Sequence, residues 1–246
     1  MKDIAWLGRT KLLVGEEKLN DLIKANVLIV GLGGVGSFAA EFIVRAGIGN
    51  LTIVDGDVVD PTNRNRQLPA LATTHGMGKA KWMEERLKAI NPELNLTVYS
   101  EFLRVQPMKD LLASSKFDYV IDAIDSITPK ITLISTCYFN GIPIVSSMGA
   151  GGKMDPTQIR VADLSKTYND RLANNVRKRL KKFKIYKGVK TVFSPEKAPP
   201  GSLMLTDGTN FKKSAYGTIS YLPAAFGGAC ASVVIRDLTH YVETKQ

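Results

Sequence analysis

The sequence is poor in cysteine, and its cysteines are not arranged to bind zinc. Only two occur, Cys137 and Cys230, and they lie far apart in the chain. Because no CxxC pair is present, a structural zinc site of four cysteines is excluded. Each cysteine stands in an apolar segment of helical character without a neighbouring base or cation, where a small buried hydrophobe is expected. We therefore expect no catalytic thiol.

Long apolar runs and a secretory leader are also missing. No stretch approaches the roughly 18 apolar residues that a membrane-spanning helix needs. The first residues contain an acid, Asp3, and neither an apolar run nor a cleavage site of small residues. We therefore expect a soluble, cytoplasmic protein with no membrane partner, and its 246 residues are enough to bury a substantial core.

Acidic residues are absent from the most basic part of the chain. The formal net charge is +10, and the segment 177–190 has 8 basic residues among 14 and no acid. Solvated helix faces normally mix the two signs, so this segment, the basic tract, favours an anionic partner over a plain solvated surface. Phe183 and Tyr186 within it either anchor the segment to the fold or stack on bases.

A glycine-rich turn is the most informative feature that is present. The apolar run 27–30 predicts a buried parallel strand, and Gly31, Gly33 and Gly36 follow it at G-x-G-x-x-G spacing before a helical segment. Such glycines allow a tight turn, close approach of a phosphate and close helix packing. Asp55, at the end of the next strand, is placed to accept hydrogen bonds from ribose hydroxyls. A turn that only joins a strand to a helix is the competing interpretation. The agreement of strand, glycines, helix and acid argues against it.

The glycines alone do not identify the nucleotide, because sites for NAD, S-adenosylmethionine and ATP all use such turns. Arg66 and Lys79 add positive charge where phosphates beyond the ribose would lie, and Asp125 at another strand end is able to hold Mg²⁺. No Walker A lysine follows the glycines, which excludes the P-loop mechanism. These downstream residues favour ATP.

Alternating strands and helices through residue 147 predict the fold class. We expect an α/β fold with a doubly wound, Rossmann-like, mostly parallel sheet and a mixed C-terminal extension. The chain is expected to form one domain over residues 1–246, with a nucleotide-binding core at about 20–150 and a basic extension at about 151–246.

The pattern changes in the extension. The strand 159–162 is expected in a different sub-sheet, and 194–214, rich in proline and glycine, is expected to be a mobile loop. Residues 222–238 predict a closing helix, whose small residues are best explained by a tight contact with another helix.

Five segments together resemble the adenylating core shared by ThiF, MoeB and the ubiquitin-activating enzymes. They are Gly31 to Gly36, Asp55 to Asp57, Asn63 to Gln67, Gly78-Lys79 and Asp122 to Asp125. The resemblance implies an ATP site made of Gly31, Gly33, Gly34, Gly36, Asp55, Asp57, Asn63, Arg66, Gln67, Lys79, Asp125 and Ser126. It also implies that Asp125 is the Mg²⁺ ligand and that Arg9 reaches the γ-phosphate of the partner subunit's ATP in a homodimer. The catalytic set is then Arg9, Arg66, Lys79 and Asp125.

Other segments narrow the resemblance within that superfamily. ThiF and MoeB carry paired CxxC zinc ligands, which are missing here. The segments 122–126, 149–157 and 163–167 resemble instead the TcdA (CsdL) family of tRNA threonylcarbamoyladenosine dehydratases. One departure is Arg171, where that family usually has proline, which bears on the local turn. The resemblance implies ATP-dependent dehydration of N6-threonylcarbamoyladenosine at tRNA position 37 to the cyclic form, by adenylation of the threonyl carboxylate and intramolecular ring closure.

The same resemblance implies the partners. Substrate tRNA would contact the basic tract through Arg177, Lys178, Arg179, Lys181, Lys182, Lys184 and Lys187. A monovalent cation and a sulfur-relay or cysteine desulfurase partner are further candidates. Two alternatives stay open: an adenylating enzyme for a sulfur-carrier or ubiquitin-like protein, which would want a reactive cysteine, and a non-catalytic nucleotide-sensing RNA-binding protein, which has no need of Arg66, Lys79 and Asp125 together.

Overall fold

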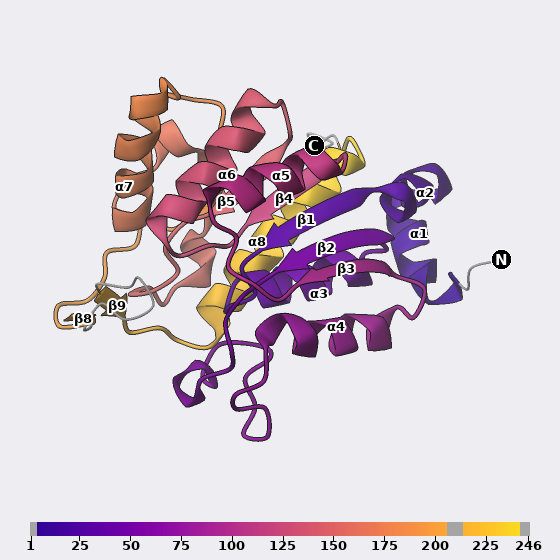
Figure 1. Ribbon diagram of the computed structural model, residues 1–246, viewed down its shortest axis with the longest axis horizontal. Coiled ribbons are helices and arrows are strands. Elements are labelled where there is room, and N and C mark those ends of the chain that lie inside the picture. The colour runs from indigo at the N-terminus through magenta and orange to yellow at the C-terminus, as the bar shows by residue number, and fades with distance from the viewer. Residues whose placement is uncertain (1–3, 206–213, 242–246) are drawn as a thin grey trace.

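Seven strands form one sheet in the computed structural model, which describes residues 4–205 and 214–241 (Figure 1). In spatial order they are β3 (Asn95–Tyr99), β2 (Asn50–Val54), β1 (Asn26–Val30), β4 (Tyr119–Asp122), β5 (Ile144–Ser147), β7 (Lys190–Phe193) and β6 (Arg160–Asp163). The helices are α1 (Gly8–Val14), α2 (Glu16–Lys24), α3 (Gly36–Arg45), α4 (Lys79–Ile90), α5 (Val105–Ser114), α6 (Ile127–Phe139), α7 (Arg171–Leu180) and α8 (Tyr221–Leu238).

The strand order reverses between β1 and β4, which are parallel neighbours. From β1 the chain builds outward through β2 to β3, then returns to β4 and builds the other way. Within this seven-stranded sheet, all pairings are parallel except that of β6 with β7. The predicted doubly wound, mostly parallel sheet is therefore confirmed, and its topological switch point lies between β1 and β4.

Two predictions for the extension are wrong in part. The strand at 160–163 does not start a different sub-sheet, because β6 pairs antiparallel with β7 and forms one edge of the main sheet. Within the predicted loop, β8 (Leu203–Leu205) pairs with β9 (Ser214–Tyr216). Residues 206–213, which the loop prediction also covers, lie outside the described part of the chain.

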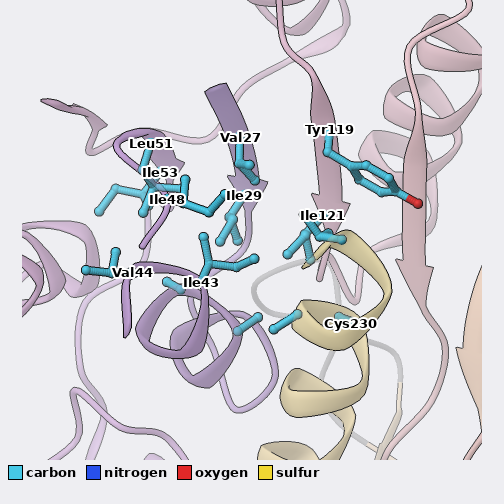
Figure 2. Packing of buried hydrophobic residues seen from close by; sticks show 14 of the residues in the cluster. Val27, Ile29, Ile43, Val44, Ile48, Leu51, Ile53, Tyr119, Ile121 and Cys230 are labelled. Atoms are coloured by element: carbon cyan, nitrogen blue, oxygen red, sulfur yellow. The ribbon is translucent and has the colours of Figure 1, made fainter. Parts of the chain in front are cut away.

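The alternation of side chains along the strands builds a core on each face of the sheet. Val27 and Ile29 of β1 join the cluster that α3, α4 and α8 cover, whereas Leu28 and Val30 join the cluster under α5, α6 and α7. Figure 2 shows the first cluster, with Val27 and Ile29 directed toward Ile43 of α3. No helix in the described ranges is long and apolar enough to cross a membrane.

The tight helix contact predicted from small residues is present between α8 and α3. A Cβ atom on Gly227 would lie 2.5 Å from the Val35 carbonyl oxygen and 3.0 Å from the Ala39 nitrogen, both backbone atoms. A Cβ on the next residue, Gly228, would meet only the Phe42 ring, at 3.6 Å. Glycine is thus required by packing at the first position only.

We expect Gly227→Ala to lower the free energy of unfolding by about 1–3 kcal/mol, because α8 must move away from α3. The matched variant Gly228→Ala should keep or raise stability by up to about 1 kcal/mol, since alanine favours helix. Urea unfolding of the two variants measures the difference. Equal stabilities would contradict the assigned contact.

Candidate nucleotide site

Three loops meet at the carboxyl ends of the central strands. The Gly31 nitrogen donates to the Val54 carbonyl at 2.8 Å, which joins the loop after β1 to the end of β2. Gly31 has φ +92, and a Cβ there would lie 2.8 Å from the Ala123 carbonyl oxygen after β4. Glycine is needed at this position for both its backbone angle and the close approach. The site therefore lies at the switch point, where open α/β sheets bind ligands.

The remaining glycines of the turn have different neighbours. A Cβ on Gly36 would lie 1.7 Å from the Gly31 carbonyl oxygen, and one on Gly34 would lie 2.9 Å from Pro223, so packing requires both glycines. A Cβ on Gly33 would meet nothing closer than the Gln67 amide nitrogen, at 3.7 Å, and Gly33 has no positive φ. Neither packing nor backbone strain accounts for glycine at position 33. Close approach of a ligand does account for it.

Asp55 ties this turn to the end of β2. Its carboxylate accepts hydrogen bonds from the Leu32 nitrogen at 2.6 Å and from the Asp57 nitrogen at 2.7 Å. Burial raises the pKa of Asp55, while the Leu32 hydrogen bond and the charge of Lys79 oppose that rise. A carboxylate has about four acceptor positions, so lone pairs remain for ribose hydroxyls.

Lys79 lies at the start of α4, and an ion pair with Asp57 holds its side chain at the same edge of the sheet. The Lys79 Nζ is 3.0 Å from Asp57 Oδ2, with the lysine side chain 6% exposed. The backbone holds the pair in register, because the Lys79 nitrogen donates to the Asp57 carbonyl at 2.9 Å. The ammonium group has three donors, so the ion pair leaves others for a phosphate.

Arg66 is positioned by the turn that precedes it. Its Nη1 donates to the Thr62 carbonyl at 2.9 Å and to Asn65 Oδ1 at 2.8 Å. Asn63 belongs to the same turn, where its side chain accepts from the Asp60 nitrogen at 3.3 Å. Burial lowers the pKa of Arg66, and the charges of Asp125 and Asp60 oppose this. The guanidinium stays protonated at neutral pH, so a fixed positive charge faces the end of β4.

Gln67 carries an unsatisfied group beside the glycine turn. Its Oε1 is buried and has no hydrogen-bond partner among the described residues, while its amide nitrogen faces Gly33. Leaving a buried acceptor unpaired costs about 1–3 kcal/mol. A donor on a ligand bound next to Gly33 would satisfy it, so the residue fits the predicted ATP site.

A buried ion pair beneath the loop 123–126 fixes the position of Asp125. Lys130 Nζ is 2.8 Å from Asp122 Oδ2, and both side chains are fully buried. Lys130 also donates to the Ile124 carbonyl at 2.8 Å, and Asp122 accepts from the Ile124 nitrogen at 3.0 Å. Sequence reasoning missed Lys130, although a lone lysine among the apolar residues of α6 was a usable signal.

Asp125 itself is exposed at the tip of this loop, next to Ser126 at the start of α6. No group of three or more His, Cys, Asp or Glu side chains that could hold a metal occurs in the described part of the chain. Mg²⁺ at nucleotide sites commonly uses one or two carboxylates plus phosphate oxygens. A single carboxylate at this edge therefore fits the predicted ion.

Some predicted residues lie elsewhere. Arg9 is on α1, at the end of the sheet where β1 begins, far from the carboxyl edge (Figure 1). Within the basic tract, the guanidinium of Arg177 is already bonded to the Thr167 carbonyl and hydroxyl oxygens at 2.5 Å, whereas Arg179 and Lys182 are exposed. At the departure from the family pattern, α7 begins with Arg171, and Asp170 caps the helix by accepting a hydrogen bond from the Ala173 nitrogen at 2.8 Å.

Both cysteines are buried in the core. Burial raises the pKa of Cys137 to about 12 and that of Cys230 to about 12. A thiol in this state is neither accessible nor ionised at neutral pH. The geometry therefore provides no cysteine nucleophile.

Comparison with known proteins gives consistent matches. The model of the ThiF family matches residues 8–246. The tRNA threonylcarbamoyladenosine dehydratase of Escherichia coli (strain K12) is 46% identical over 202 residues, covering 78% of this chain and 75% of the relative. The protein of that name from Bacillus subtilis (strain 168) is 44% identical over 189 residues, covering 77% and 74%. The crystal structure of the E. coli dehydratase, TcdA, in complex with ATP has a TM-score of 0.88 to this chain at 40% identity, covering 98% of this chain and 97% of that one.

We expect Gly33→Ala to weaken ATP binding about tenfold or more, because the added methyl group occupies the space that a phosphate would approach. The free energy of unfolding should stay the same or rise by up to about 1 kcal/mol, since the native backbone angle suits alanine. Calorimetric titration with ATP and thermal unfolding measure the two effects.

Gly36→Ala is the matched comparison, because its methyl group would collide with the Gly31 carbonyl and should destabilise the fold itself. A folded Gly33→Ala protein that binds ATP like the wild type would show that no ligand approaches this glycine.

Proposed function

The chain belongs to the ThiF family, and we propose that it uses ATP to dehydrate N6-threonylcarbamoyladenosine in tRNA to the cyclic form. The observation that carries the proposal is the single edge that holds Gly33, Asp55, Arg66, Lys79 and Asp125, in a chain similar over 98% of its length to an ATP-bound dehydratase. Consistent with this activity, we place the protein in the cytoplasm.

The proposed reaction starts at a carboxylate, which is a poor electrophile. One carboxylate oxygen of the threonyl group attacks the α-phosphorus of ATP, the bond to the β-phosphate oxygen breaks, and pyrophosphate leaves. The substrate's own nucleophile then attacks the activated carbonyl carbon, the carbon–oxygen bond to AMP breaks, and the nucleophile loses its proton. AMP leaves with the original carboxylate oxygen, so the net change is loss of water from the substrate. Alignment of an intramolecular step can provide an effective molarity of about 10⁵ M or more.

The residues at the edge have distinct roles in this scheme. The backbone at Gly33 and the first N–H groups of α3 face the phosphates, where the helix dipole favours an anion. Arg66 and Lys79 add cations, each worth roughly 4 kcal/mol to a charge about 4 Å away at an effective dielectric near 20. Asp55 accepts hydrogen bonds from the ribose hydroxyls. Asp125 would hold Mg²⁺, which supplies further neutralisation of phosphate charge when bound.

Arg9 is proposed to act on the second copy of a homodimer. It lies at the wrong end of the sheet to reach its own site, and among the described residues no carboxylate forms an ion pair with it (Figure 1). The helix that carries it, α1, buries none of its residues, and Leu12 and Leu13 are 84% and 86% exposed. An apolar pair this exposed favours a partner surface.

The second candidate, an adenylating enzyme for a sulfur-carrier or ubiquitin-like protein, is disfavoured by the burial of both thiols. The basic tract also suits an RNA substrate better than a protein tail. A monovalent cation and a sulfur-relay partner stay predictions of the sequence.

We expect Asp125→Asn to reduce formation of the cyclic nucleoside roughly a hundredfold, because the charge that orients the triphosphate is lost. The measurement is mass spectrometry of tRNA nucleosides after incubation of modified tRNA with enzyme and ATP. The double variant Cys137→Ala, Cys230→Ala is the control and should keep its activity. Loss of activity in that control together with a trapped thiol-linked intermediate would replace the proposal with the carrier-protein alternative.

Mixing experiments test Arg9. Arg9→Ala and Asp125→Asn should each be inactive alone, but mixed dimers would contain one complete site. An equal mixture after subunit exchange should recover about a quarter of wild-type activity if the dimer is symmetric. No recovery in a mixture that has demonstrably exchanged subunits would show that Arg9 does not act across an interface.

A further inference from the structure

A groove of about 600 Å³ runs along α6 and is lined by residues of α5, α6 and α7. These three helices cover the same face of the sheet (Figure 1). Lys109 of α5 and Arg179 of α7 lie on its walls, as do Lys182 and Phe183 of the short helix η5 (Lys181–Phe183). The length of α6 forms its floor, from Thr128 to Phe139. We call this feature the α6 groove.

The charge of the α6 groove has one sign. Lys109, Arg179 and Lys182 are among its lining residues, and no aspartate or glutamate is. Arg179 and Lys182 are exposed, and neither forms an ion pair with a described residue. Cations lining one concave surface without compensating acids favour a polyanion.

Two of the apolar side chains that line the groove, Phe139 and Phe183, are aromatic and exposed. Phe139 is 64% exposed and Phe183 is 48% exposed, so a large part of each ring is accessible to a ligand. Exposed aromatic side chains interleaved with cations are the pattern that binds single-stranded nucleic acid, because bases stack on the rings while phosphates meet the cations. Phe183 is not among the buried core residues, which favours stacking on bases over anchoring of the basic tract.

The position of the groove relates it to the nucleotide edge. Asp125 lies just before Ser126, the N-cap of α6, and Thr128 lines the groove in the first turn of that helix. Phe139 ends the helix, about 16 Å further along its axis at 1.5 Å per residue. An RNA chain that leads away from the reacting nucleotide at the carboxyl edge would thus enter the groove at Thr128.

We propose that the α6 groove holds the unpaired nucleotides next to the reacting adenosine, with bases on Phe139 and Phe183 and phosphates on Lys109, Arg179 and Lys182. The inference rests on the proposed function for the identity of the RNA. Only part of the basic tract then contacts this RNA segment. Lys178 and Lys181 do not line the groove, and Arg177 is hydrogen-bonded within the fold.

The test compares two charge-matched variants of the full chain. Arg179→Ala with Lys182→Ala removes two groove cations, and Lys178→Ala with Lys181→Ala removes two cations of the same segment outside the groove. Affinity for an unmodified anticodon stem–loop RNA is measured without ATP at several salt concentrations. The groove variant should bind at least tenfold more weakly, with a log–log salt slope flatter by about 1.4, or about 0.7 for each single-strand contact. The variant Lys178→Ala with Lys181→Ala should lose much less RNA affinity.

A second comparison separates stacking from charge. Phe139→Ala with Phe183→Ala should weaken stem–loop binding about tenfold or more while leaving the salt slope unchanged. Binding of a fully paired RNA of equal length should change little. Thermal unfolding confirms that each variant is folded.

Equal losses in the two charge variants, or wild-type stem–loop affinity in the phenylalanine variant, would overturn the proposal. Loss of self-association in the phenylalanine variant with unchanged RNA affinity would instead assign the groove to a second copy of the chain. Because binding is measured without catalysis, groove-dependent binding by a protein that makes no cyclic product would uphold the groove and reject the proposed function. Normal turnover with an unchanged KM for tRNA in both groove variants would instead uphold the proposed function and reject the groove as an RNA site.

Discussion

The buried ion pair between Asp122 and Lys130 is the interaction on which the candidate site depends. It ties the end of β4 to α6 and holds the backbone of Ile124 through both its N–H and its carbonyl group. That loop in turn packs against Gly31. Because removing one partner of such a pair leaves a buried charge, at a typical cost of about 3–5 kcal/mol, the structure keeps the loop in one arrangement. Asp125 is presented at the tip as a consequence.

Charge is then distributed over separate regions of the molecule. At the carboxyl edge, Lys79 and Arg66 are held by hydrogen bonds before a ligand arrives, which is the condition for electrostatic catalysis. The α6 groove carries exposed cations without acids, which suits a long, hydrated polyanion. The apolar surface of α1 lies at the other end of the sheet and suits neither ligand. One chain thus offers three chemically different surfaces.

The sequence predicted the sheet and its nucleotide edge because those features are local. A strand, a glycine turn and a helix are adjacent in the chain, and Asp55, Lys79 and Asp125 each stand at the end of such an element. The sequence did not predict the pairing of β6 with β7, since an edge strand takes its partner from tertiary structure. Nor did it show that Lys130 pairs with Asp122, or that Arg177 is used within the fold while Arg179 faces the groove. Those distinctions depend on side-chain direction.

In the proposed mechanism, ATP bound at the switch point between β1 and β4 activates a carboxylate by adenylation. The most direct measurement uses tRNA whose threonyl carboxylate carries oxygen-18, with the isotope traced by mass spectrometry after turnover. One labelled oxygen should appear in AMP, because ring closure expels the nucleotide together with that oxygen. Label found in inorganic phosphate alongside ADP, or released as water with none in AMP, would contradict it.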